Sequence, residues 1–133
     1  MLESPKLQEN PLSKEIVDAA YEIHTKLGPG LLESVYEVIL AAELKSHGLR
    51  IERQVPVPIV WKNIQFIEGY RLDLMVEDKV LVKVKAVEAI EPVHKMQLLT
   101  YLRLMDKRLG LLINFNEELI RNGISRVVNG LQD

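Results

Sequence analysis

The chain contains no cysteine, few aromatic residues and no excess of basic charge. The lack of cysteine excludes disulfides, thiol catalysis and cysteine-ligated metal sites. Because aromatic residues make up only 5% of the sequence, aliphatic side chains must build the core. The formal net charge of -2 gives no overall basic field, so any binding of nucleic acid must rest on a local basic patch.

Long apolar runs are missing as well, and no segment approaches the ~20 residues that span a membrane as a helix. The first fifteen residues are polar and include Pro5 and Pro11, unlike a signal peptide. We therefore expect a cytoplasmic protein with no membrane partner. The length of 133 residues predicts one domain over residues 12–133, preceded by a flexible N-terminal arm of residues 1–11.

The periodicity of apolar residues changes along the chain and predicts an α+β fold. Helical spacing covers residues 13–27, 31–47 and 92–106, whereas alternation typical of strands covers residues 50–61, 64–76 and 80–87. Pro56 and Pro58 mark the first extended segment as an edge or a bulged strand. The apolar run of residues 109–115 predicts a buried strand.

The segment RLDLMVEDKVLVKVKAVE predicts a hairpin whose turn lies at the sequence EDK. If Val76 pairs with Val80, then Asp73 faces Lys83 on the neighbouring strand. Alternation would place Leu72, Leu74 and Val76 on the core face and the Asp73–Lys83 pair on an open face, with Lys85 one diagonal step away. An ordinary surface ion pair is the more common explanation of such a pair, with a contribution of at most about 1 kcal/mol.

Two further residue sets flank this hairpin in the sequence. The segment GLLESVY places Gly30, Glu33 and Tyr36 in the spacing G-x-x-E-x-x-Y. The segment QLLTY places Gln97 and Tyr101 four residues apart, on one face of the third predicted helix. Taken alone, the first set is explained by a solvated glutamate and a buried tyrosine. The second set, taken alone, is explained by a polar helix face.

Taken together with the hairpin, these sets resemble the GxxExxY family, a branch of the PD-(D/E)xK nuclease-like superfamily. The stretches GPGLLESVYE, GYRLDLMVEDKV and KRLGLLINFN add to the resemblance, which runs from about residue 13 to residue 131. It implies a restriction-endonuclease-like α-β-β-β-α-β core with an extra N-terminal helix. It also implies a site at the open end of the central hairpin.

In active members of the superfamily, an aspartate and an acid on the next strand bind magnesium or manganese, and a lysine two residues later assists the attacking water. A helical glutamate joins the metal shell in some branches. The resemblance assigns these roles to Asp73, position 83, Lys85 and Glu33, with Glu33 and Asp73 as the metal ligands. Gln97 and Tyr101 would lie beside the site, where they orient the lysine or contact the phosphate backbone.

The chain departs from this pattern at Lys83, which stands where the family has glutamate or aspartate. An ammonium group has no lone pair to give to a metal. We therefore expect a nuclease architecture that binds divalent metal weakly or not at all. Three origins of Lys83 stay open: loss of activity, an introduced substitution, or a divergent site. Another acid could in principle replace the metal ligand missing at position 83. The local candidates are Glu68, Glu77 and Glu88, and their expected positions make such a replacement unfavourable.

The implied partner is nucleic acid, either DNA or RNA, contacted through a basic patch of Arg71, Lys83, Lys85 and Lys95. Two functions stay open: a metal-dependent phosphodiesterase weakened by Lys83, and a non-catalytic module that binds nucleic acid or protein. The proline-marked strand and the apolar C-terminal segment are compatible with a homodimer.

Overall fold

The computed structural model describes residues 8–66 and 69–131. The elements follow in the order α1 (Glu9–Leu27), α2 (Glu33–Ser46), β1 (Ile51–Pro56), β2 (Ile59–Trp61), β3 (Ile64–Phe66), β4 (Arg71–Val76), β5 (Val80–Lys85), α3 (Pro92–Met105), β6 (Leu109–Asn114), the 3-10 helix η1 (Ile120–Gly123) and β7 (Ile124–Val128). Among the described residues, no helix combines the length and the apolar character that crossing a bilayer requires.

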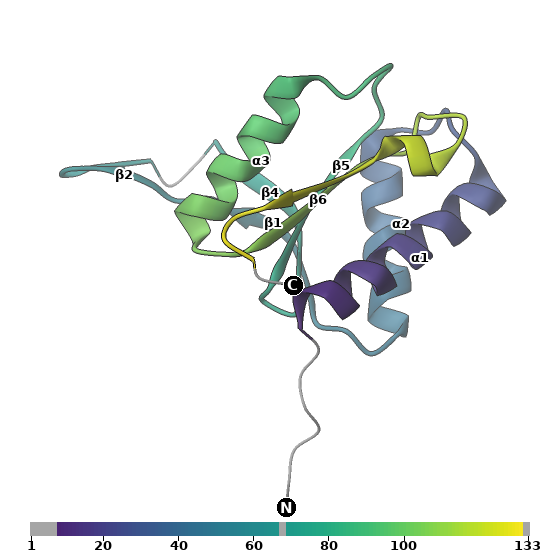
Figure 1. The fold of residues 1–133 in the computed structure, drawn as a ribbon, viewed down its shortest axis with the longest axis horizontal. Coiled ribbons are helices and arrows are strands. Elements are labelled where there is room, and N and C mark those ends of the chain that lie inside the picture. The colour runs from purple at the N-terminus through teal and green to yellow at the C-terminus, as the bar shows by residue number, and fades with distance from the viewer. Residues whose placement is uncertain (1–7, 67–68, 132–133) are drawn as a thin grey trace, which may run out of the picture.

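Five strands form the central sheet in the order β1-β4-β5-β6-β7 (Figure 1). Strands β5 and β6 are parallel and joined by α3, whereas the other neighbours are antiparallel. Helices α1 and α2 cover one face of the sheet and α3 covers the other. This arrangement contains the α-β-β-β-α-β core and the extra N-terminal helix that the resemblance implied, and the α+β prediction is confirmed.

Helix α1 begins earlier than the sequence suggested. Residues 9–11, which we assigned to the N-terminal arm, are its first residues, and Gln8 is its N-cap. Residues 1–7 of the arm lie outside the described part of the chain. Pro11 is compatible with this position because the N–H groups of the first helical turn have no acceptor within the helix. A proline near the predicted boundary therefore did not mark the start of the helix.

The extended segments 50–61 and 64–76 are each divided into two strands. Strand β1 ends at Pro56 and β2 begins at Ile59, so that β2 and β3 form a separate two-stranded sheet. A hydrogen bond from the Val57 N–H to the Tyr70 carbonyl closes the base of this hairpin. We refer to the described residues 57–66, 69 and 70 as the hairpin arm, whose strands β2 and β3 extend away from the body of the molecule in Figure 1.

The sheet is buried on both faces, which corrects the expectation of an open face beside Asp73. Leu74 and Val76 pack under α1 and α2, whereas Met75 and Leu81 pack under α3. Leu72 also joins the cluster under α3 rather than the one that contains Leu74. The expected alternation therefore breaks at Asp73.

Tyr36 connects the start of α2 to the core. Its hydroxyl donates a 2.6 Å hydrogen bond to the Gly28 carbonyl and accepts one of 3.2 Å from the Leu31 N–H. Its fully buried ring stacks on Phe115, with ring centroids 4.5 Å apart and planes inclined by 7°. The tyrosine thus holds the glycine-rich loop at a fixed distance from the helix that carries Glu33.

We expect Tyr36→Phe to lower the free energy of unfolding by about 1–2 kcal/mol, because it leaves the Gly28 carbonyl and the Leu31 N–H without their shared partner. Urea unfolding followed by circular dichroism measures this difference. Tyr21→Phe is the matched control, since Tyr21 is 41% exposed, and should cost less than about 0.5 kcal/mol. Equal losses in both variants would contradict the role given to the Tyr36 hydroxyl.

Candidate functional site

The candidate site forms where β4 diverges from β5. The backbone ladder runs from the Val76–Val80 pair, as predicted, to the Leu74–Val82 pair, and ends there. On its other side β5 continues to pair with β6 as far as Lys85 and Asn114. Beyond Val82, the edge of β5 that faces β4 therefore offers backbone N–H groups without a strand to accept them.

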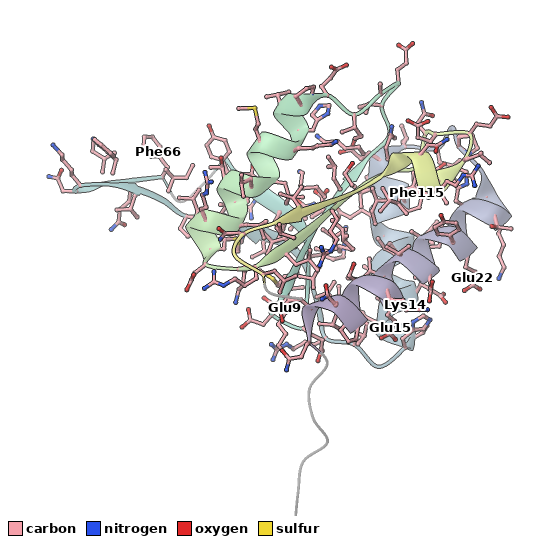
Figure 2. The ribbon with its side chains drawn as sticks, in the orientation of Figure 1. Glu9, Lys14, Glu15, Glu22, Phe66 and Phe115 are labelled. Carbon is pink, nitrogen blue, oxygen red and sulfur yellow. The ribbon has the colours of Figure 1, made fainter. Side chains whose placement is uncertain are left out.

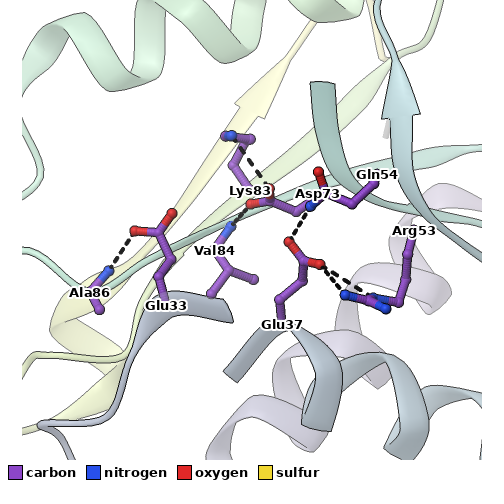
Figure 3. Close-up of polar contacts among 8 residues, drawn as sticks. All are labelled: Glu33, Glu37, Arg53, Gln54, Asp73, Lys83, Val84 and Ala86. Atoms are coloured by element: carbon purple, nitrogen blue, oxygen red, sulfur yellow. Dashed lines mark hydrogen bonds and ion pairs between the residues drawn. The ribbon is translucent and has the colours of Figure 1, made fainter. Parts of the chain in front are cut away.

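Two carboxylates accept these hydrogen bonds. Asp73 Oδ2 accepts from the Val84 N–H at 2.7 Å, and Glu33 Oε2 accepts from the Ala86 N–H at 3.3 Å (Figure 3). The two donors are alternate residues of one strand edge, so they lie roughly 7 Å apart. Glu33 is the first residue of α2, where its negative charge also interacts favourably with the helix dipole.

Lys83 makes the ion pair with Asp73 that the sequence predicted. Its Nζ lies 3.5 Å from Asp73 Oδ1, and the two side chains are only 14% and 10% exposed. One oxygen of Asp73 thus faces the ammonium group while the other accepts the Val84 N–H. Both sides of this carboxylate are engaged within the protein.

Glu37 is a site residue that the sequence analysis missed. It is buried, and its carboxylate accepts hydrogen bonds from Arg53 Nη2 at 2.8 Å and from Gln54 Nε2 at 2.7 Å (Figure 3). Burial raises the pKa of Glu37 above 4.5; the hydrogen bond from Arg53 opposes this shift, and the neighbouring Asp73 carboxylate adds to it. The available signal was its position four residues after Glu33, on the same face of α2.

The same network explains the broken alternation. Gln54 and Asp73 lie between the Arg53–Leu74 and Val55–Leu72 pairs of β1 and β4, and Gln54 has a left-handed backbone with φ of 53°. Glu37 binds the side chains of both Arg53 and Gln54 across this distortion. The distortion lies at Asp73, the residue whose side chain bridges the gap to β5.

The other residues that the sequence assigned to the site have fewer contacts with the network around Asp73. Tyr101 is buried; its burial raises the pKa of the hydroxyl above 10.0, and the charges of Tyr70 and Asp73 add to the shift. Its hydroxyl is therefore a protonated donor near Asp73 at neutral pH. Gln97, one turn earlier on α3, is exposed. Lys85 is half-buried, and its ammonium has no hydrogen-bond or ion-pair partner among the residues that the structure describes.

The two peripheral basic residues of the predicted patch are exposed. Arg71 donates to the Gln54 carbonyl at 3.3 Å, and Lys95 lies in the first turn of α3. Of the acids considered for rescue of the metal site, Glu77 accepts from the Arg50 N–H, Glu88 is exposed, and Glu68 lies outside the described residues. The additional carboxylate beside Asp73 is instead Glu37, from α2.

The sequence model of the PD-(D/E)XK nuclease superfamily matches residues 10–127. The chain belongs to this superfamily. No curated protein and no solved structure matches the chain. The match extends from the first turn of α1 into β7 and includes α2, β4, β5 and α3, which carry the candidate site residues; the restriction-endonuclease-like fold agrees with it.

Enzymes of the PD-(D/E)XK superfamily typically use a divalent metal, so the donor groups must be compared with what such an ion needs. Magnesium and manganese prefer several oxygen ligands with free lone pairs. Within residues 8–66 and 69–131, no three aspartate, glutamate or histidine side chains are grouped so that they could hold an ion. Asp73 faces the Lys83 ammonium, and Glu37 faces the Arg53 guanidinium. These residues do not fit a resident divalent metal.

We expect the pKa of Glu37 to fall in an Asp73→Asn variant, because the substitution removes the neighbouring negative charge that raises it. Carbon-detected NMR titration of the Glu37 carboxyl measures both values. Arg53→Met, which removes the opposing cation, should shift the pKa upward instead. A Glu37 pKa that is unchanged by either substitution would show that the carboxyl does not sense these neighbours.

The sign of the corresponding pH dependence follows from the same shift. The folded carboxyl of Glu37 holds its proton more tightly than the unfolded chain does, because its pKa is raised. Its contribution to the free energy of unfolding is therefore greatest below pH 4.5 and falls as the pH rises through the folded pKa. Urea unfolding at a series of pH values should show this slope reduced in Asp73→Asn.

Proposed function

We propose that this chain is a GxxExxY-type member of its superfamily that binds nucleic acid, and that Lys83 stands in place of the catalytic metal. Metal-dependent cleavage is then lost or strongly weakened, while affinity for phosphate is kept. The observation that carries this proposal is the ion pair between Lys83 Nζ and Asp73 Oδ1.

The electrostatic reason begins with the charge at position 83. A lysine in place of an acid raises the local charge by two units. The side chain at this position then repels a divalent cation, whereas an acid would attract it. Because Lys83 and Asp73 are largely shielded from water, this repulsion is screened less than it would be on the surface. A metal ion would also have to displace Lys83 from Asp73 before it could bind that carboxylate.

The reason to expect phosphate affinity is that the same substitution adds a cation. Lys83 and the unpaired ammonium of Lys85 lie two residues apart on β5, and Arg71 stands two residues before Asp73 on β4. We propose that these residues and Lys95, in the first turn of α3, form a basic patch around the open end of the β4–β5 pair. Phosphate contacts of this kind give affinity that depends on salt and little on sequence.

We expect Lys83→Glu to create measurable binding of manganese, because it removes the competing ammonium and adds a carboxylate beside Asp73. Isothermal titration should detect binding by this variant and none by the unaltered chain. Manganese should also raise the thermal unfolding midpoint of the variant alone. Lys45→Glu makes the same change of charge at an exposed position late in α2 and should bind no better than the unaltered chain.

Plasmid nicking with magnesium or manganese extends this test to chemistry. The unaltered chain should show little or no nicking, and any activity that Lys83→Glu gains should disappear when Asp73→Ala is added. Tight manganese binding or robust nicking by the unaltered chain would overturn the proposed replacement of the metal by Lys83.

We expect gel retardation of DNA or RNA without added metal, weakening steeply as the salt concentration rises. Replacing a lysine that contacts phosphate should reduce the slope of log affinity against log salt by about 1. Lys85→Gln should have this effect, whereas Lys45→Gln should leave affinity and slope unchanged. Failure of the unaltered chain to retard either nucleic acid at low salt would argue against the nucleic-acid assignment.

A further inference from the structure

The hairpin arm has one apolar face that the rest of the described chain leaves largely uncovered, with Ile59 half-buried at its base. In the β2–β3 register, Ile59 pairs with Phe66 and Trp61 pairs with Ile64, so these four side chains share one face. Val60 and Gln65 form the opposite face. Trp61, Ile64 and Phe66 are 65%, 51% and 50% exposed, and Figure 2 shows Phe66 out on the arm, far from the buried Phe115.

A two-stranded hairpin of this kind gains little stability from itself. Both strands are edges, and none of their residues is buried. Isolated two-stranded hairpins are marginal in water and need a further strand or a packed face to become stable. The arm therefore has both an uncovered apolar face and unpaired backbone edges, which are the two features that a protein partner can complete.

From these features we infer that the hairpin arm is a homodimer interface, in which the Ile59–Trp61–Ile64–Phe66 face packs against the same face of a second copy. This inference goes beyond the proposed function and does not depend on it. An isologous dimer requires a surface that is complementary to itself, and an uncharged apolar face meets that requirement without bringing like charges together.

The size of the face agrees with what a dimer needs. The four side chains expose roughly 400 Å² of apolar surface, as judged from typical side-chain areas. A standard interface buries about 800 Å² on each partner, of which a little more than half is apolar. The apolar face therefore supplies about the apolar area of one side of a stable interface, and the polar rim of the arm can supply the rest.

The charge of the arm favours protein over nucleic acid as the occupant of this face. Lys62 is the one charged residue within residues 57–66, and it lies at the turn, with Nζ 5.7 Å from the centre of the Trp61 ring. Surfaces that bind single strands combine stacking aromatics with a basic groove. Ile59 and Ile64 occupy the corresponding positions here and offer no phosphate contact.

The hairpin arm also joins the central sheet beside the candidate site. Strand β4 begins at Arg71, immediately after the arm and two residues before Asp73. A dimer formed through the arms thus joins two copies by segments that continue directly into their candidate sites.

Sedimentation velocity of the full chain over a dilution series, without nucleic acid, measures the dimer directly. We expect a concentration-dependent dimer whose dissociation constant rises by about tenfold or more in Phe66→Ser. Val60→Ser is the matched control, because Val60 is 57% exposed on the opposite face, and should change the constant by less than about threefold. Circular dichroism melting should be similar in all three proteins, since the arm is separate from the central sheet.

Tryptophan fluorescence gives an independent readout, because Trp61 is the single tryptophan of the chain. Its emission should shift to shorter wavelength as the protein concentration rises, and the shift should disappear in Phe66→Ser. A monomer at every concentration with unchanged emission would overturn the dimer. Equal dissociation by Val60→Ser would overturn the assignment of the face, and an emission change that occurs only on adding a DNA or RNA oligonucleotide would assign the face to nucleic acid instead.

Discussion

The candidate site depends on one constraint: the backbone N–H groups of Val84 and Ala86 need acceptors after β4 has separated from β5. A buried N–H without a partner costs free energy comparable to a lost hydrogen bond. Asp73 and Glu33 meet this need with their carboxylates, from a strand and from the start of a helix. The separation of the strands, the position of α2 and the convergence of the acids are therefore aspects of one arrangement.

This constraint also gives Asp73 a structural role in addition to any chemical one. Its carboxylate accepts the Val84 N–H of β5 at 2.7 Å, a contact that needs no metal. Lys83 then balances the charge of a largely buried carboxylate, and Arg53 does the same for Glu37. The two buried acids beside the gap, Asp73 and Glu37, thus each have a cation from within the chain, which is how a protein keeps buried charge tolerable.

The sequence predicted the fold and the hairpin register well because both follow from strong local patterns. The apolar spacing of the helices and the EDK turn gave the order of elements and the pairing of Val76 with Val80. Asp73 and Lys83 were placed together by that register alone. The start of α1 was wrong because the prediction began the helix at residue 13, where the apolar spacing begins, although residues 9–11 already belong to its first turn.

Other features depend on contacts between distant segments, which local patterns do not contain. Glu37 resembles any glutamate in an amphipathic helix until β1 brings Arg53 and Gln54 to it. The cover that α3 places over Met75 and Leu81 was missed because alternation in one hairpin does not show what packs on its second face. The separate hairpin arm likewise follows from where β1 and β4 close, at Val57 and Tyr70.

The contact of Tyr36 with the Gly28–Leu31 loop gives a structural reason for the G-x-x-E-x-x-Y spacing. Gly30 adopts a backbone with φ of 103° that suits glycine, and the Tyr36 hydroxyl ties that loop to the helix that carries Glu33. The glycine and the tyrosine of this spacing therefore serve the fold, whereas Glu33 between them accepts a hydrogen bond from the Ala86 N–H at the candidate site.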